Sequence, residues 1–158
     1  MIGIVLNTNN ASINDLQITA NKLLLISNQV IITSDDQNVQ NYFNLHSSSK
    51  VVTQQRPFNK NNCLSEIYAA SLYFPEQSDF VTLSTEFKQL KPVILTNLTN
   101  NSNCYAATIK QNYYSISHFN INNYDLSQYL NLDDFNLKQF ITQEIQCLPL
   151  IFSTGNMF

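Results

Sequence analysis

Glycine is nearly absent from this chain: Gly3 and Gly155 are the only two glycines among 158 residues. Average usage of roughly 7% would give about eleven. Loops that wrap a phosphate depend on glycine, because glycine adopts positive φ freely and lets backbone N–H groups approach the ligand. Neither glycine lies in such a loop, so the sequence excludes a glycine-rich phosphate loop.

Positive charge is also scarce. Lysine and arginine together number 8, against 11 aspartates and glutamates, and the formal net charge is −3. Arg56 is the sole arginine, and the lysines are scattered along the chain. A nucleic-acid groove needs clustered basic side chains, so we expect no nucleic-acid partner.

Long apolar runs are missing as well. No run approaches the roughly 18 residues that a membrane span requires. The first residues lack the basic segment and the small-residue cleavage site of a secretory signal. We therefore expect no membrane partner and a cytoplasmic location.

Cysteine and histidine are few and widely spaced. Three cysteines, an odd number, favour reduced and buried thiols over a disulfide framework. Zinc sites need paired ligand spacing, which these side chains do not offer. The sequence therefore predicts no metal site among Cys63, Cys104, Cys147, His46 and His118.

Apolar segments do occur, in a regular alternation. With 44% hydrophobic residues, the chain suits one compact domain over residues 1–158. Continuous apolar runs predict strands at 2–6, 29–34, 50–53, 80–84, 92–96, 104–109 and 148–152. Helical periodicity predicts helices at 15–27, 37–45, 64–74, 111–118, 124–130 and 136–144. The first of these helices has Asp15 or Asn14 as its expected N-cap.

Strands that alternate with helices at this spacing favour βαβ units. We predict the α/β class, a three-layer α/β/α sandwich with a mostly parallel sheet. In such folds ligands bind beyond the carboxyl ends of the strands. The loops after Leu6, Ser34, Thr53 and Leu83 therefore bound the expected site.

Four segments, in order, carry a family resemblance. Residues 2–6 fit the strand before an L-A-G-G-x-S-x-R-M-G-x-D-K loop, and 62–70 look like a G-P-L-[AS]-G-I-x-A-A helix start. Residues 80–87 are similar to an apolar strand ending in P-C-D-x-P-F, and 135–141 to an R-S-[VL]-R-x-[FL]-L helix. The chain resembles the molybdenum-cofactor guanylyltransferases (MobA-like), which belong to the sugar-nucleotide-type nucleotidyltransferases.

The resemblance implies a nucleotidyltransferase fold and an activity, the transfer of GMP from GTP to a pterin phosphate with Mg²⁺. GTP and Mg²⁺ would then be the ligands. It also implies nucleotide-binding positions after the first strand, at the start of helix 64–74 and at the end of strand 80–84. These positions are Leu6, Thr8, Asn9, Ser12, Leu64, Ser65 and Ser84.

The first loop departs from the family at its paired glycines and at both of its cationic positions. Thr8 and Asn9 stand at the paired glycines, Ile13 stands at the arginine, and Ile18 stands at the lysine. A triphosphate carries about four negative charges, and isoleucine cannot neutralise them.

The other two motifs depart as well. Ser84 stands at the aspartate that holds Mg²⁺ in the family, with Glu86 as the nearest carboxylate. Glu66 replaces a glycine and would put a negative charge where phosphate or base should approach. We therefore assign no catalytic residue and no metal ligand.

These losses leave three hypotheses. The chain is a MobA-like nucleotidyltransferase with weakened or lost catalysis, or it is a non-catalytic binding or regulatory protein that retains the fold. The partner would be a nucleotide in the first case, and a nucleotide or a protein in the second. The third hypothesis is an unrelated α/β domain with a similar order of elements.

The remaining polar motifs have plainer interpretations. The pairs Asp35–Asp36 and Asp133–Asp134 are typical of turns and N-caps, and His118 suits a half-buried structural histidine. Ser84 lacks a nucleophile-elbow sequence, so we expect a surface-facing loop serine. Arg56, with Lys60, offers a minor candidate for contact with a ligand phosphate.

Overall fold

The computed structural model describes residues 1–8, 11–58, 62–76, 79–131 and 136–158. Its strands are β1 (Ile2–Leu6), β2 (Gln29–Thr33), β3 (Lys50–Val52), β4 (Asp79–Ser84), β5 (Cys104–Ala107), β6 (Asn112–Asn120) and β7 (Leu148–Ile151). Its helices are α1 (Ile13–Leu24), α2 (Gln37–His46), α3 (Cys63–Tyr73), α4 (Pro92–Thr99), α5 (Asn123–Asn131), α6 (Leu137–Gln139) and α7 (Thr154–Met157). A 3₁₀ turn, η2 (Thr85–Phe87), follows β4, and a π-helical turn, η3 (Phe140–Glu144), continues α6.

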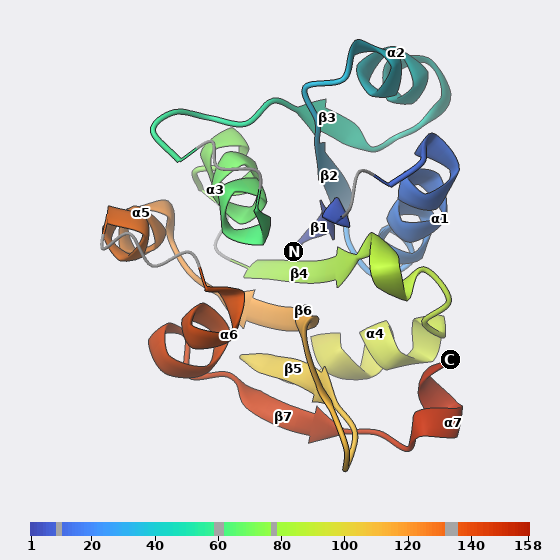
Figure 1. The fold of residues 1–158 in the computed structure, drawn as a ribbon, viewed down its shortest axis with the longest axis vertical. Coiled ribbons are helices and arrows are strands. Elements are labelled where there is room, and N and C mark those ends of the chain that lie inside the picture. The colour runs from blue at the N-terminus through green and yellow to red at the C-terminus, as the bar shows by residue number, and fades with distance from the viewer. Residues whose placement is uncertain (9–10, 59–61, 77–78, 132–135) are drawn as a thin grey trace.

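The strands form one seven-stranded sheet in the order β3-β2-β1-β4-β6-β5-β7. The pairs among β3, β2, β1 and β4 are parallel, β6 runs antiparallel to both β4 and β5, and β7 is parallel to β5. Helices cover both faces of this sheet (Figure 1). The predicted α/β sandwich with a mostly parallel sheet is confirmed.

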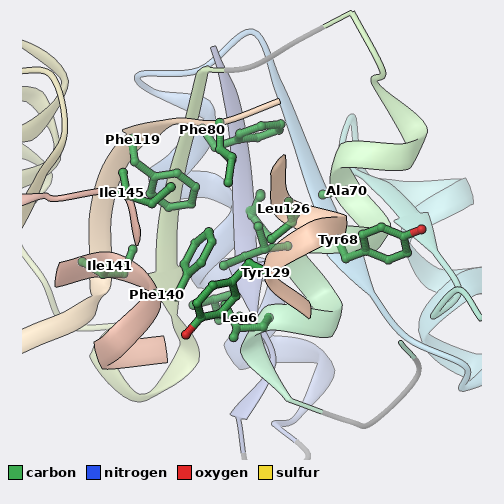
Figure 2. Packing of buried hydrophobic residues seen from close by; sticks show 14 of the residues in the cluster. Leu6, Tyr68, Ala70, Phe80, Phe119, Leu126, Tyr129, Phe140, Ile141 and Ile145 are labelled. Atoms are coloured by element: carbon green, nitrogen blue, oxygen red, sulfur yellow. The ribbon is translucent and has the colours of Figure 1, made fainter. Parts of the chain in front are cut away.

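The core has two layers, one on each face of the sheet. On one face, α3, α5 and η3 pack apolar side chains against β1, β4 and β6. Aromatic rings lie at its centre, where Phe140 contacts Phe119 and Tyr129 with ring centroids 5.9 and 5.2 Å apart (Figure 2). On the other face, α1, α2 and α4 cover the same sheet. The inner strands are buried on both faces, which explains why they read as continuous apolar runs.

Helix starts follow local capping rules. Ser12 Oγ accepts a hydrogen bond from Asp15 N at 3.2 Å and caps α1, so the predicted cap at Asp15 or Asn14 is wrong by two or three positions. Asn62 Oδ1 accepts from Ser65 N at 2.9 Å and caps α3. Asp36 caps α2, as expected for one member of its acidic pair. The pair Asp133–Asp134 lies outside the described residues.

Two predicted elements have the wrong type. The strand expected at 92–96 is helix α4, which begins with Pro92 and turns Ile94, Leu95 and Leu98 toward the core. Proline suits a helix start because its missing N–H has no partner there anyway. The helix expected at 111–118 is the long strand β6, and the short helix α7 was not predicted.

Gly3 has a packing role in the centre of the sheet. A Cβ atom at this position would lie 2.8 Å from Ser27 Oγ and 3.0 Å from both Leu23 Cβ and Val30 Cγ2. The glycine therefore lets α1 approach β1 closely. Separately, no helix among the described residues has the length and apolar character needed to cross a membrane.

Candidate functional site

The expected site lies at the edge of the sheet where β1 and β4 end. The two strands are parallel neighbours, and Leu6 and Ser84 are in register at their carboxyl ends. Leu6 is fully buried in the core beneath this edge. The loop after β1, the η2 turn after β4 and the first turn of α3 surround the edge, and their side chains decide what it can bind.

Three hydroxyl groups join the loop after β1 to the end of β4. Thr8 Oγ1 lies 3.0 Å from Ser84 Oγ and 3.2 Å from Thr85 Oγ1. Ser84 Oγ also accepts a hydrogen bond from Glu86 N at 3.2 Å, and Thr85 Oγ1 donates toward the Leu6 carbonyl at 3.5 Å. We call Thr8, Ser84 and Thr85 the hydroxyl cluster. These bonds direct the polar groups of the edge at one another.

The prediction of Ser84 as a surface-facing loop serine is wrong. Ser84 ends β4 and is 0% exposed, because the loop after β1 and the η2 turn cover it. Its hydroxyl is neutral and already hydrogen-bonded, whereas Mg²⁺ sites use carboxylate oxygens. Among the described residues no group of three histidine, cysteine, aspartate or glutamate side chains is placed to hold a metal ion. The residues present therefore do not fit the Mg²⁺ that the resemblance implies.

Glu66 closes the edge from the side of α3. It lies in the first turn of that helix and is only 5% exposed. Its carboxyl oxygens Oε1 and Oε2 both accept from the backbone N–H of Asn7, at 3.2 and 3.1 Å. The first backbone amide after β1 is thereby used within the protein.

Burial changes the charge expected of Glu66. Desolvation raises the pKa of this carboxyl from 4.5 to about 8, and the hydrogen bond from Asn7 opposes only part of that effect. At neutral pH the carboxyl is therefore largely protonated. The expectation of a negative charge at this place is corrected: Glu66 is a mostly neutral group.

Polar groups at the start of α1 also form hydrogen bonds within the protein. Asn7 Oδ1 accepts from Ala11 N at 3.1 Å, and Ser12 Oγ serves as the helix cap. Asp15, in the first turn, forms an ion pair with Lys88 Nζ at 2.6 Å. The hydrogen bond from Lys88 lowers the pKa of Asp15. An acidic residue in this turn interacts favourably with the positive end of the helix dipole. Lys88 is already paired with Asp15.

The other predicted positions serve structure in the same way. Leu64 and Ser65 are fully buried, and the Ser65 hydroxyl donates to Asn62 Oδ1 at 3.3 Å. Ile13, which stands at the family arginine, packs against the core on the α1 face. Arg56 is exposed. Asn9 and Lys60 lie outside the described residues.

Groups away from this edge are structural. His118 is buried, with Nε2 2.7 Å from Asp79 Oδ1 and Nδ1 2.6 Å from the Asn101 carbonyl. The half-buried structural histidine that the sequence suggested is therefore a buried one. The three cysteines are free. Burial raises the pKa values of Cys63 and Cys147 to about 12 and that of Cys104 to about 11, so each remains a thiol.

A separate surface cavity of about 410 Å³ lies at the opposite edge of the sheet. Asn120 at the end of β6 lies in it, and Asn120 pairs with Asp79 at the start of β4. Its other lining residues are Ile121, Asn122, Asp125, Glu144 and Ile145. The carboxyl ends of β1 and β4 do not contribute to this cavity.

Sequence reasoning found the edge but missed two of its residues. Asn7 supplies the amide that Glu66 binds, and Thr85 completes the hydroxyl cluster. Both are adjacent to predicted positions, which was the available signal. Their partners lie 59 and 77 positions away along the chain, and no local pattern indicates such contacts.

Comparison with solved structures identifies the fold. A 4-diphosphocytidyl-2C-methyl-D-erythritol synthase from Anaerococcus prevotii DSM 20548 superposes with a TM-score of 0.61 at 10% sequence identity. The alignment covers 98% of this chain and 87% of that chain. A second 4-diphosphocytidyl-2C-methyl-D-erythritol synthase gives 0.55 at 8% identity, over 98% and 89% of the two chains. No family model and no curated protein matches the sequence. The chain has the fold of these synthases.

Proposed function

We propose that this protein is a non-catalytic member of the nucleotidyltransferase fold and acts by binding, as a regulatory or scaffolding protein. The observation that carries the proposal is the hydrogen bond from the Asn7 amide to the buried Glu66 carboxyl. A nucleotide that approached this edge would have to displace a side chain of the protein before it met a backbone N–H group. The hydroxyl cluster supports the same conclusion from the β4 side.

Charge supports the proposal independently. Phosphoryl transfer depends on positioning and on neutralising the phosphate charge, and one such group commonly contributes on the order of 3 kcal/mol to the reaction. Lys88 is the cation beside the start of α1, and it is paired with Asp15. Isoleucines stand at both cationic positions of the resembled family. No transfer step is supported by the residues described at this edge.

A second candidate is nucleotidyl transfer with weakened catalysis. The MobA-like motifs favour GTP and a pterin phosphate as substrates, and the names of the structural neighbours favour a cytidine nucleotide. The segment 62–70 is the observation behind the first choice, since it keeps the leucine, serine, isoleucine and paired alanines of the family's helix start. Either activity would require another source for the missing cations.

Calorimetric titration of GTP and CTP, each with Mg²⁺, tests the proposal. We expect no binding by the wild type at millimolar nucleotide, and no release of pyrophosphate in a coupled assay with an active synthase as positive control. Micromolar binding would overturn the interpretation of the edge as closed, and turnover would overturn the whole proposal.

The variant Glu66→Gly tests whether closure by Glu66 is the reason. It restores the glycine of the resembled motif and frees the Asn7 amide. We expect weak nucleotide binding to emerge without turnover, since the cations and the metal aspartate are still missing. Glu76→Gly, which removes an exposed carboxylate elsewhere, is the matched control and should bind no nucleotide.

A further inference from the structure

The two outer strands of the sheet differ in how they meet solvent. β3, at one end, has three residues and begins with Lys50, and a short charged edge is a common protection against pairing with other chains. β7, at the other end, carries Leu148 and Ile151, which are 72% and 57% exposed. In Figure 1, β7 forms the lower border of the sheet. In the described part of the chain, no strand pairs with its outer side.

The hydrogen bonds of β7 show which backbone groups face outward. Leu148 N donates to the Asn103 carbonyl at 2.9 Å, and Phe152 N donates to the Ala107 carbonyl at 2.8 Å. Successive residues of a strand direct these groups to opposite sides. The N–H and C=O groups of Ile151 and the C=O group of Pro149 therefore point away from β5. Pro149 has no N–H to offer.

The segment around β7 is free of charge. Residues 145–158 contain no aspartate, glutamate, lysine, arginine or histidine. The charges that commonly protect an edge strand are absent. Residues 145–158 of two copies can meet without opposing like side-chain charges, although each copy carries a net charge of −3 and Lys110 lies next to Ile109. Such an edge suits a second copy of the chain better than a charged peptide.

We infer that β7 is a homodimer interface, in which two copies join their sheets antiparallel about a two-fold axis at Ile151. In that register Ile151 and the partner's Ile151 exchange both of their main-chain hydrogen bonds. Ser153, whose backbone is extended (φ −72°, ψ 140°), donates its N–H to the carbonyl of the partner's Pro149. An axis at Pro149 would lack both of its central donors, so the proline disfavours that register.

Neighbouring apolar side chains add to this surface. Leu150 and Phe152 are partly buried against the α4 face. The antiparallel register places Leu150 beside the partner's Phe152, and Phe152 beside the partner's Leu150. Ile109, 95% exposed, lies in the turn after β5, two residues beyond the position paired with Ile151. Stable interfaces bury about 1,200–2,000 Å² in total. One short strand pair is a small interface on this scale, so we expect weak association with dissociation in the micromolar range or above.

Sedimentation velocity of the full chain, from low micromolar to submillimolar concentration, tests the interface. We expect a concentration-dependent dimer that Ile151→Lys weakens by about tenfold or more, because two like charges would stand opposite each other. Leu25→Lys is the matched control, since Leu25 is an equally exposed apolar residue at the end of α1. Its dimer should match the wild type, and the far-UV spectra of both variants should be unchanged.

Amide hydrogen exchange gives a second readout that needs no variant. The Ile151 N–H should gain protection as the concentration rises, whereas the inward Phe152 N–H should be protected throughout. A wild type that stays monomeric at submillimolar concentration would overturn the inference. A dimer that survives Ile151→Lys, or an Ile151 amide that exchanges equally fast at all concentrations, would do so as well.

Discussion

The two halves of the sheet differ in whether polar groups at their borders are hydrogen-bonded within the protein or face solvent. In the parallel half, β3-β2-β1-β4, the polar groups at the carboxyl ends of β1 and β4 are bonded within the protein by Glu66 and by the hydroxyl cluster. In the other half, β6-β5-β7, the outer strand β7 exposes the side chains of Leu148 and Ile151 and directs the Ile151 N–H away from the sheet. The difference teaches that contacts within one chain can occupy the polar groups at one edge of a sheet while those of another edge stay exposed.

The largest expected effect comes from Glu66→Gln, which keeps the acceptor for Asn7 but removes the ionisable proton. A carboxyl whose pKa rises from 4.5 to about 8 on folding destabilises the native state as the pH increases through that interval. The wild type should therefore be most stable below about pH 4.5 as far as this group is concerned, and lose that contribution by about pH 8. Glutamine has nothing to ionise, so the variant should be more stable above about pH 8 by on the order of 4 kcal/mol.

Urea unfolding of the wild type and the variant at mildly acidic and at alkaline pH measures this effect. Their free energies of unfolding should agree at the acidic end and diverge at the alkaline end. Glu76→Gln, at an exposed carboxylate, should follow the wild type at both. Parallel pH profiles for wild type and Glu66→Gln would show that Glu66 is not buried in the way the closed edge requires.

Gly3→Ala tests how tightly the closed half is packed. The added methyl group meets three atoms within 3.0 Å, two of them on Leu23 and Val30, and overpacking of this kind costs about 1–3 kcal/mol. Gly155→Ala, in α7, is the control, because nothing lies within 4 Å of the position that its Cβ would occupy. Thermal unfolding should show a lower midpoint temperature for Gly3→Ala than for the wild type, and an unchanged midpoint for Gly155→Ala. Equal midpoints for the two variants would contradict the close approach of α1 to β1.

Thr8→Val addresses the hydroxyl cluster alone. The substitution keeps the side-chain shape but leaves Ser84 and Thr85 without one partner, which we expect to cost about 1–2 kcal/mol in urea unfolding. Thr96→Val removes an exposed hydroxyl that bonds within its own helix and should have a smaller effect. If the two variants were equally stable, the cluster would contribute nothing to closing the edge.

The smallest effect on monomer stability is expected from Ile151→Lys. The side chain is exposed, so at concentrations where the wild type is monomeric the free energy of unfolding should change by less than about 0.5 kcal/mol. A larger loss would mean that the outer strand is supported by its own side chain within one copy, and the contrast between the halves would disappear.

The sequence predicted the parallel half better than the other half for a physical reason. Strands buried on both faces, such as β1 and β4, need continuous apolar runs, and few alternatives fit such runs. The segment 92–99 also begins with an apolar run, and a short run cannot distinguish a buried strand from a helix. β6, with its bulge against β5, lacks a clean alternation.

For the site, the sequence could locate the carboxyl ends of the strands, but it could not show that the polar groups there bond to one another. Leu6 and Ser84 were predicted at strand ends because apolar runs stop there, and the structure brings them into register. The contacts that close the edge join Asn7 to Glu66 and Thr8 to Ser84, across 59 and 76 positions. Such pairings depend on the three-dimensional packing of α3 and β4 around β1. The substitution of a glycine by Glu66 was visible, but its burial and mostly neutral form were not.

The order of strands in the sheet also bears on synthesis of the chain. All four strands of the parallel half lie within residues 2–84, and the remaining strands follow from residue 104 onward. A ribosome therefore makes the strands of one half of the sheet before it makes any described strand of the other. Among the described strands β7 is made last, so self-association along it has to wait until the other strands of the sheet have been made.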